Sequence, residues 1–303
     1  MVGGTGHISG KKIVHVGMEY WRSAPKKFNI TPDKHALGGV IGNLAEHQLT
    51  YGNNLRIYLP RPHDIAAEVK TISSEKMKIV AQEPKEVSIS RVNIDMPKEE
   101  NKGDLEIYLI EDDSLYGDFN LYGRSENWIF PWVIFPLAVL EHLRKTEFAP
   151  NIIHCHEWQT GLLPVYHKVQ SSILGDEGLR NSRIIFTPHN YKNLGFFSSK
   201  QWPIVGLPGI MLTPDSLGHY DDICLLKAGM HADKTLFNSK EQLDQSIADE
   251  ELKGIHMHIK KMLEEGKILC AMETKYGEEN INQYYEGIEN AYQQLLQDLK
   301  IKD

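Results

Sequence analysis

The fold of this chain is decided by two stretches, Asn151-Ile-Ile-His-Cys-His-Glu-Trp-Gln-Thr-Gly-Leu-Leu-Pro164 and Ile184-Ile-Phe-Thr-Pro-His-Asn-Tyr-Lys-Asn-Leu-Gly-Phe-Phe197. Each begins as a short apolar run and then continues into a cluster of polar and aromatic residues. Buried parallel strands have such apolar runs, and open α/β sheets bind ligands at the carboxyl ends of these strands. A helical pattern separates the two runs, so we predict a βαβ unit whose polar clusters face one crevice.

The rest of the chain alternates between strand and helix patterns in the same way. Further strands are expected at Lys12–Gly17, Leu55–Leu59 and Thr235–Asn238, and helices at Leu37–Thr50, Trp132–Lys145, Asp221–Ala232 and Lys240–Ile259. Three apolar alternations, at Met77–Ala81, Val87–Ile94 and Leu105–Ile110, predict a strand-rich insertion. The alternation predicts an α/β fold with a doubly wound, Rossmann-like parallel sheet in a single domain.

The two ends of the chain have different patterns. Residues 1–11 contain a glycine-rich run, but a phosphate-binding loop must follow a strand and open a helix, and here a strand follows instead. We therefore expect a flexible leader at 1–11, a main domain at 12–240 and a helical segment at 241–303 that packs back on it. One face of Ile281–Leu299 is apolar, with Ile281, Tyr284, Tyr285, Ile288, Tyr292, Leu295, Leu296 and Leu299 at helical spacing.

Composition excludes several functional classes. The 303 residues are 41% apolar and 24% charged, as in soluble globular proteins. A net charge of −8 argues against nucleic-acid binding, and no apolar run approaches the ~18 residues of a membrane span. The three cysteines form no CxxC pair and no secretory signal is visible, which predicts a reduced, cytoplasmic protein.

The first polar cluster follows the strand pattern at 152–156. His154 and His156 share one face of this strand, and Glu157 and Trp158 follow where it ends. Gln159 and Thr160 begin the next helix, whose free N–H groups attract oxygen-rich ligands. An HxH pair can also hold a divalent metal, or simply cap backbone groups. No acidic ligand in a suitable context follows, so we expect no metal.

The second cluster favours a sugar ligand. His189 and Asn190 supply neutral donors and acceptors for hydroxyl groups, and the following Tyr191, Phe196 and Phe197 supply aromatic faces for the C–H side of a ring. A turn capped by Asn190, with the aromatics in the core, is the alternative.

Together the motifs resemble the amino-terminal half of bacterial and plant glycogen/starch synthases. The resemblance rests on HxH-acid-W-x-T-G-LLP, then on FT-x-HN-Y-x-N-x-G-FF, and then on Leu225-Leu-Lys-Ala-Gly-x-x-Ala-Asp233. The opening Lys12–Trp21 and the segment Tyr116-Gly-Asp118, followed by Trp128 and Phe130, fit the same half. The match covers roughly residues 12 to 240, in order.

The resemblance implies a GT-B glycosyltransferase, in which two Rossmann-like domains face each other across a cleft. One domain receives an α-glucan and the other binds ADP-glucose or UDP-glucose, with no cofactor or metal required. His189 matches the family histidine that contacts the transferred glucose, and Glu157 stands where the family has aspartate; both are catalytic candidates. Substrate-binding candidates are His156, Trp158, Gln159, Thr160, Asn190 and Tyr191.

The sequence departs from the family at the donor side. Where the family has the K-x-G-G-L loop around the donor phosphates, this chain has Asp33, His35 and Ala36; Lys34, Gly38 and Gly39 are what remains of the loop. A carboxylate there repels phosphate, and side chains block close approach of the backbone. After Ser239 we find no second set of βα units, and Ile281–Leu299 resembles the helix that returns to the first domain.

Three functions remain open. The chain is a glucan synthase whose donor site another chain completes, or a non-catalytic subunit that binds α-glucan or a partner synthase, or, more remotely, a metal-dependent hydrolase built on the HxH pair. The expected partners are an α-glucan and a donor-domain chain, a synthase chain or a second copy. No nucleic acid or membrane is expected.

Overall fold

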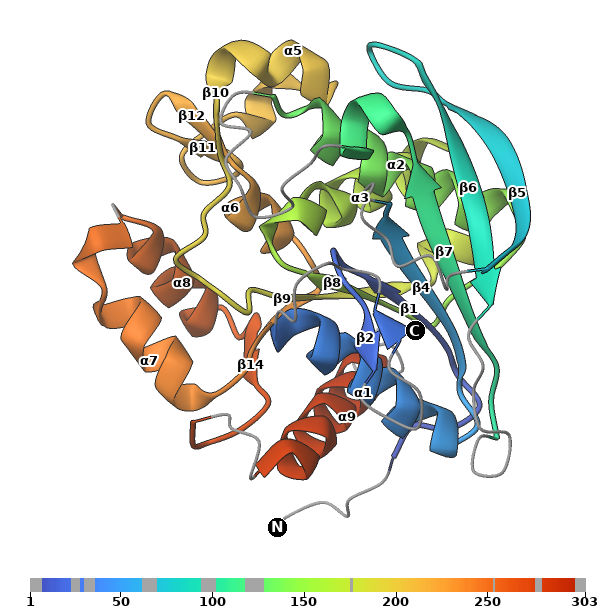
Figure 1. Ribbon diagram of the computed structural model, residues 1–303. Helices are drawn as coiled ribbons and strands as arrows, with labels where there is room; N and C mark the ends of the chain where they lie inside the picture. The colour runs from blue at the N-terminus through green and yellow to red at the C-terminus, as the bar shows by residue number, and fades with distance from the viewer. Residues whose placement is uncertain are drawn as a thin grey trace.

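The computed structural model describes residues 7–22, 28–29, 36–61, 70–93, 102–117, 128–174, 177–252, 254–275 and 280–297. Within these ranges the chain forms a large twisted sheet with helices on both faces (Figure 1). This arrangement confirms the predicted α/β fold with a sheet dominated by parallel strands.

Within the same ranges, the strand order of the nine-stranded sheet is β14-β13-β9-β8-β1-β4-β7-β6-β5. The strands from β14 to β7 pair in parallel, and a β5–β6 hairpin adds antiparallel strands at one edge. Their bounds are β1 (Lys12–Val16), β4 (Asn54–Pro60), β5 (Lys70–Ile79), β6 (Lys85–Asn93), β7 (Leu105–Glu111), β8 (Ile152–His156), β9 (Arg183–Thr187), β13 (Lys234–Phe237) and β14 (Ile268–Cys270).

Alternation along the strands sends side chains to two separate cores. Ile13, Ile152 and Ile185 face the core formed with α1 (Ala36–Thr50) and α9 (Ile281–Gln297). The opposite core contains Val14 and Ile153, and it is covered by the helices α2 (Phe130–Lys145), α3 (Leu162–Leu174), α6 (Leu225–Gly229), α7 (Lys240–Ala248) and α8 (Ile255–Glu264). The parallel strands are therefore buried on both faces, as their continuous apolar runs require.

Smaller elements complete the described structure. A three-stranded sheet has the order β10-β12-β11. The remaining short elements are β2 (Trp21–Arg22), β3 (Phe28–Asn29), α4 (Glu177–Arg180), β10 (Phe196–Ser198), α5 (Trp202–Val205), β11 (Gly218–His219) and β12 (Asp222–Cys224). In the described parts, no helix combines the length and the apolarity that crossing a bilayer requires.

Several elements differ from the sequence prediction. The expected helix over 221–232 begins as β12, because this segment pairs antiparallel with β10, and only α6 is helical. The expected helix over 240–259 is divided into α7 and α8, with Gly254 at a φ of 93° just before α8. In the predicted insertion, only β5 and β6 form the hairpin, since β7 pairs in parallel with β4.

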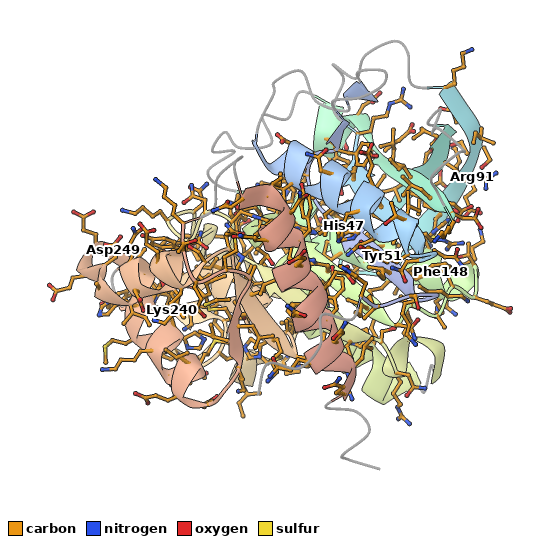
Figure 2. All side chains as sticks on the ribbon, turned by 90° about the horizontal axis from the view of Figure 1, so that it is seen from below. His47, Tyr51, Arg91, Phe148, Lys240 and Asp249 are labelled. Atoms are coloured by element: carbon orange, nitrogen blue, oxygen red, sulfur yellow. The ribbon has the colours of Figure 1, made fainter. Side chains whose placement is uncertain are left out.

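The two ends of the chain are also more structured than expected. β14 lies within the segment 241–303 that was expected to be helical, and it extends the main sheet beside β13. Of the expected leader, residues 1–6 lie outside the described residues. Ile8 is buried, its N–H donates to Glu289 on α9, and its carbonyl accepts from Asn53. His7 and Ile8 are thus packed against α1 and α9, which lie side by side in Figure 2.

Candidate functional site

The candidate site lies at the carboxyl ends of the central strands. The chain leaves β1 toward β4 on one side, while β8 pairs with β1 on the other, so the strand order reverses between β1 and β8. Such a reversal separates the loops above the sheet and is where doubly wound folds bind ligands. Glu157 directly follows β8, and His189 follows β9 by two residues.

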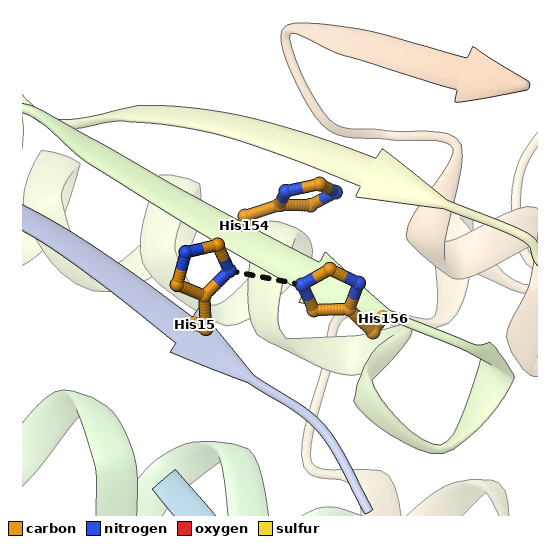
Figure 3. A group of neighbouring side chains, drawn as sticks. All are labelled: His15, His154 and His156. Atoms are coloured by element: carbon orange, nitrogen blue, oxygen red, sulfur yellow. Dashed lines mark hydrogen bonds between the residues drawn. The ribbon is translucent and has the colours of Figure 1, made fainter. Parts of the chain in front are cut away.

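Three buried histidines lie side by side at this point. His15 of β1 pairs in register with His154 of β8, and His156 lies two residues further along the same face. The His154 and His156 rings stack with centroids 3.9 Å apart, and His15 Nδ1 lies 3.1 Å from His156 Nε2 (Figure 3). None of the three has solvent-exposed surface. The predicted pair of histidines therefore belongs to a larger cluster.

Hydrogen bonds occupy all six ring nitrogens of this cluster. His15 bonds to Gln48 as well as to His156, and His156 bonds to His189 at 2.9 Å. His154 bonds to Thr187 and to Tyr292, each at 2.7 Å. Candidate ligand atoms of the three rings lie within 4.8 Å of one another. A metal ion would have to displace these bonds, and a buried cluster of satisfied, neutral histidines explains the same geometry without one.

The cluster is neutral at pH 7. Burial lowers the pKa of His15 to about 4, against a smaller opposing effect of the Gln48 hydrogen bond. Burial also lowers the pKa values of His154 and His156 well below 6.5, and the neighbouring histidines lower them further. His189, which keeps some solvent exposure, has its pKa lowered to about 4 by burial, with a hydrogen bond to Asn238 opposing.

Glu157 occupies a strained position between β8 and the following turn. Its φ of 69° and ψ of 162° fall in a region that is almost confined to glycine and costs about 1–3 kcal/mol for other residues. Its Oε1 accepts a hydrogen bond from the Asn190 N–H at 2.7 Å, which joins the two predicted clusters. Its Oε2 is buried without a hydrogen-bond partner among the described residues. Strain and an unpartnered buried oxygen are typical of a ligand site.

Burial raises the pKa of Glu157 to about 8, although backbone N–H groups of Asn190 and Trp158 oppose this. The carboxyl group is thus largely protonated at pH 7. A protonated carboxyl both donates and accepts, so it suits a hydroxyl ligand better than a phosphate.

Glu157→Gln is expected to flatten the pH dependence of stability. Because the folded pKa of about 8 exceeds the ordinary 4.5, folded wild-type protein binds more protons than unfolded protein between these values. The carboxyl's contribution to stability is present below about 4.5 and is lost as pH rises through 8, by up to about 1.4 kcal/mol per pH unit. Urea unfolding across this range should show the smaller slope in the variant. Exposed Glu264→Gln is the matched control and should keep the wild-type slope.

The other predicted site residues are placed differently. Asn190 is exposed and beside Glu157, and Tyr191 is buried. Gln159 and Thr160 have no exposed surface, and the Thr160 hydroxyl donates to the Glu157 carbonyl at 2.8 Å. Thr160 therefore stabilises the turn that carries Glu157 and does not face an open cleft.

Trp158 is half-buried and packs beside the second cluster. Its ring lies edge-on to Trp132, 5.4 Å between centroids, and close to Gly195. A Cβ at Gly195 would lie 2.5 Å from the indole, and the φ of 62° there also favours glycine. Gly195 of the second motif therefore leaves room for the indole ring of Trp158 in the first motif.

The donor-loop remnant is only partly described. Lys34, with Asp33 and His35, lies outside the described residues. Gly38 and Gly39 lie in the first turn of α1, and Gly39 is buried.

Sequence reasoning missed several members of the site. His15, Gln48, Thr187, Asn238, Glu289 and Tyr292 all contact its histidines directly or through one neighbour. His15 had a detectable signal, since it stands among apolar residues on a central strand. Gln48 and Glu289 had none, because each is one polar residue on an amphipathic helix.

Comparisons with known proteins indicate the family of this chain. Residues 33–261 match the family model of the starch synthase catalytic domain. The glycogen synthase of Lachnospira eligens is 35% identical over 153 residues, covering 49% of this chain and 32% of that protein. The glycogen synthase of Desulforamulus reducens is 28% identical over 233 residues, covering 75% and 47%. The chain thus spans less than half the length of these relatives.

The fold is similar to a solved structure as well. The catalytic domain of starch synthase IV from Arabidopsis thaliana, bound to ADP and acarbose, superposes with a TM-score of 0.69. The two are 20% identical, and the match covers 90% of this chain and 53% of that one. Since the family model covers most of the sequence, the chain belongs to the glycogen and starch synthase family of GT-B glycosyltransferases.

Proposed function

We propose that these 303 residues form the glucan-binding side of a glucosyltransferase, acting on an α-1,4-glucan with ADP-glucose or UDP-glucose as donor. The observation that carries this proposal is the pair Glu157 and His189. The two side chains come from neighbouring strand ends and are tied together through the Asn190 backbone and His156. In this pair, one carboxyl oxygen has no partner among the described residues.

The protonation states favour a sugar over an anion. With a pKa of about 8 for Glu157 and about 4 for His189, both groups are mainly uncharged near neutral pH. Uncharged donors and acceptors match sugar hydroxyls, which carry no charge themselves. In this proposal His189 positions the glucose and Glu157 orients a hydroxyl near it.

The same protonation states leave the nucleotide leaving group to other residues. Transfer from a nucleotide sugar needs cationic or hydrogen-bonding groups to stabilise the departing phosphates. The neutral pair cannot supply that charge, and Asp33 stands where the family has lysine. We therefore propose that transfer needs a nucleotide-binding domain in addition to these 303 residues, from the same protein, another chain or a partner synthase.

A non-catalytic glucan-binding subunit is the second candidate. The observation that favours it is the altered donor loop, in which Asp33, His35 and Ala36 replace the lysine and glycines. Such a subunit would hold α-glucan, or a partner synthase, without transferring sugar.

Sedimentation with glycogen tests the proposal and separates the two candidates. The chain is incubated with glycogen and radiolabelled ADP-glucose or UDP-glucose, and the polysaccharide is pelleted. Protein in the pellet is expected, and label there only with a nucleotide-binding domain present. Label in the pellet with the chain alone would contradict the proposal that transfer needs a further nucleotide-binding domain. Absence of the protein from the pellet would contradict glucan binding.

His189→Ala is expected to weaken glycogen binding about fivefold, since it removes one hydrogen bond to a sugar hydroxyl. Dissociation constants from pelleting at a series of glycogen concentrations measure this. His256→Ala on α8 is the control and should bind like wild type. Unchanged binding by His189→Ala would remove the histidine from the proposed site.

A further inference from the structure

A continuous row of polar side chains connects α9 to His189 through the interior. Glu289 Oε1 accepts from Gln48 Nε2 at 3.2 Å, and Gln48 Oε1 lies 2.8 Å from His15 Nε2. His15 Nδ1 lies 3.1 Å from His156 Nε2, and His156 Nδ1 lies 2.9 Å from His189 Nε2. We call these five residues the polar row. It joins α9, α1, β1, β8 and the loop after β9.

The polar row is closed to solvent except at His189. Gln48, His15 and His156 have no exposed surface, and Glu289 is 1% exposed. Because water cannot supply alternative partners, each hydrogen bond constrains the next one along the row. The inner end of the row therefore influences the group at its outer end.

The proton positions follow from the Glu289 end. Its Oε2 accepts from the backbone N–H of Ile8, which can only donate, and its Oε1 faces Gln48. Gln48 thus donates through Nε2 and turns Oε1 toward His15. A neutral His15 then carries its proton on Nε2 and accepts at Nδ1.

The same reasoning continues outward. His156 donates from Nε2 to His15 and accepts at Nδ1, so His189 donates from Nε2. Nδ1 of His189 is then the unprotonated acceptor.

We propose that Glu289 of α9 is a positioning residue that fixes the Nε2–H tautomer of His189 through Gln48, His15 and His156. The inference rests on the proposed function in one respect, namely that His189 contacts the sugar. A single tautomer gives Nδ1 of His189 one defined role, as an acceptor, where a mixture of tautomers would make it an acceptor in some molecules and a donor in others. The helix that packs across the opposite end of the row thereby takes part in the site.

Glu289→Gln should exchange donor and acceptor in every hydrogen bond of the polar row. Ile8 N–H still needs an acceptor, so the new amide places its oxygen there and its NH₂ group toward Gln48. Gln48 must then turn its oxygen inward and its NH₂ group toward His15. His15, His156 and His189 follow, and His189 becomes protonated on Nδ1. The Tyr292 hydroxyl, which also bonds to Gln48, can rotate to suit either arrangement.

The test is long-range ¹⁵N–¹H NMR of the chain labelled at histidine, at about pH 8, where the buried histidines are neutral and Glu289, with a pKa of about 7, is mainly ionised. Loss of one signal in His189→Ala assigns His189. Wild type should show Nε2–H at His189, and Glu289→Gln should show Nδ1–H. Glu286→Gln, exposed one turn away on α9, is the matched control and should match wild type.

A second variant allows the proposal to be tested even if the Glu289→Gln protein misfolds. Gln48→Leu interrupts the polar row and should leave His189 as a mixture of the two tautomers. Persistence of a single Nε2–H form in either folded variant would overturn the proposal. Glycogen affinity is measured in parallel, with about a fivefold loss expected in Glu289→Gln. If wild-type protein fails to bind glycogen, the proposed function is wrong. The NMR measurement still tests the proposed tautomer independently.

Discussion

Gly287→Ala is expected to destabilise the protein by about 3 kcal/mol or more, because an added methyl group would meet the backbone and not a flexible side chain. A Cβ at Gly287 on α9 would lie 1.7 Å from the carbonyl oxygen of Ala271 and 2.6 Å from its carbonyl carbon. Ala271 follows β14, so α9 would have to move away from the sheet. The midpoint of urea unfolding measures the loss.

Whether Gly287→Ala lowers or raises the free energy of unfolding distinguishes a steric clash from an effect of helix propensity. In an exposed helix, replacing glycine by alanine stabilises by about 1 kcal/mol, so propensity alone predicts the opposite result. Asn290→Ala, exposed on the same helix, is the control and should change stability by less than about 1 kcal/mol. A Gly287→Ala protein more stable than wild type would show that α9 does not approach β14 this closely.

Displacement of α9 should also disturb the site. Glu289 and Tyr292 lie on α9, within two turns of Gly287, and they bond to Gln48 and to His154. A helix moved by even about 1 Å stretches these hydrogen bonds beyond their useful range. The glycine thus supports both the fold and the polar row.

Acid should destabilise the protein progressively below about pH 6.5. His15 and His189 have pKa values lowered from 6.5 to about 4, and those of His154 and His156 are also well below 6.5. Between these values unfolded protein binds more protons, so the stability that these groups contribute is present above 6.5 and is lost as pH falls through about 4. Each such histidine costs up to about 1.4 kcal/mol per pH unit.

Two buried carboxyls act in the opposite direction. The pKa values of Glu157 and Glu289 are raised to about 8 and about 7, so stability from these two groups falls as pH rises from 4.5 through those values. Three further histidines, His142, His231 and His258, also have pKa values lowered to about 4 by burial, so seven histidines oppose the two carboxyls on the acid side. Urea midpoints measured from about pH 4 to 9 should therefore have a maximum near pH 6.5 to 7 and decrease most steeply below it. A flat profile between pH 4.5 and 6.5 would show that the histidines are not buried as neutral groups.

Much of the fold follows from local pattern. The strands at Lys12–Val16, Ile152–His156 and Arg183–Thr187 are short apolar runs, and α1 and α2 begin and end within two residues of their expected bounds. Elements with weaker local signals were missed. β12 was assigned to a helix because its strand conformation depends on pairing with β10, and β14 is three residues that are stabilised by β13 and α9.

The sequence predicted part of the candidate site, as it predicted part of the fold. Glu157, His156, His189 and Asn190 do come together, since the carboxyl ends of neighbouring parallel strands meet at one edge of a sheet. Thr160 was a substrate-binding candidate, and the structure buries it in the turn, where its hydroxyl donates to the Glu157 carbonyl. The strained backbone of Glu157 was not predictable, because it arises from the geometry at the end of β8.

By itself the sequence determined the alternating βα order, the family and the residues at the strand ends, because these depend on local apolar periodicity and on short motifs. Only the tertiary structure decided which polar groups meet and which of them carry protons. Glu289 and Gln48 are 241 positions apart, and His15 and His156 are 141 apart. Burial shifts a pKa, and a hydrogen bond fixes a tautomer, only once folding has brought such distant groups together and removed the water between them.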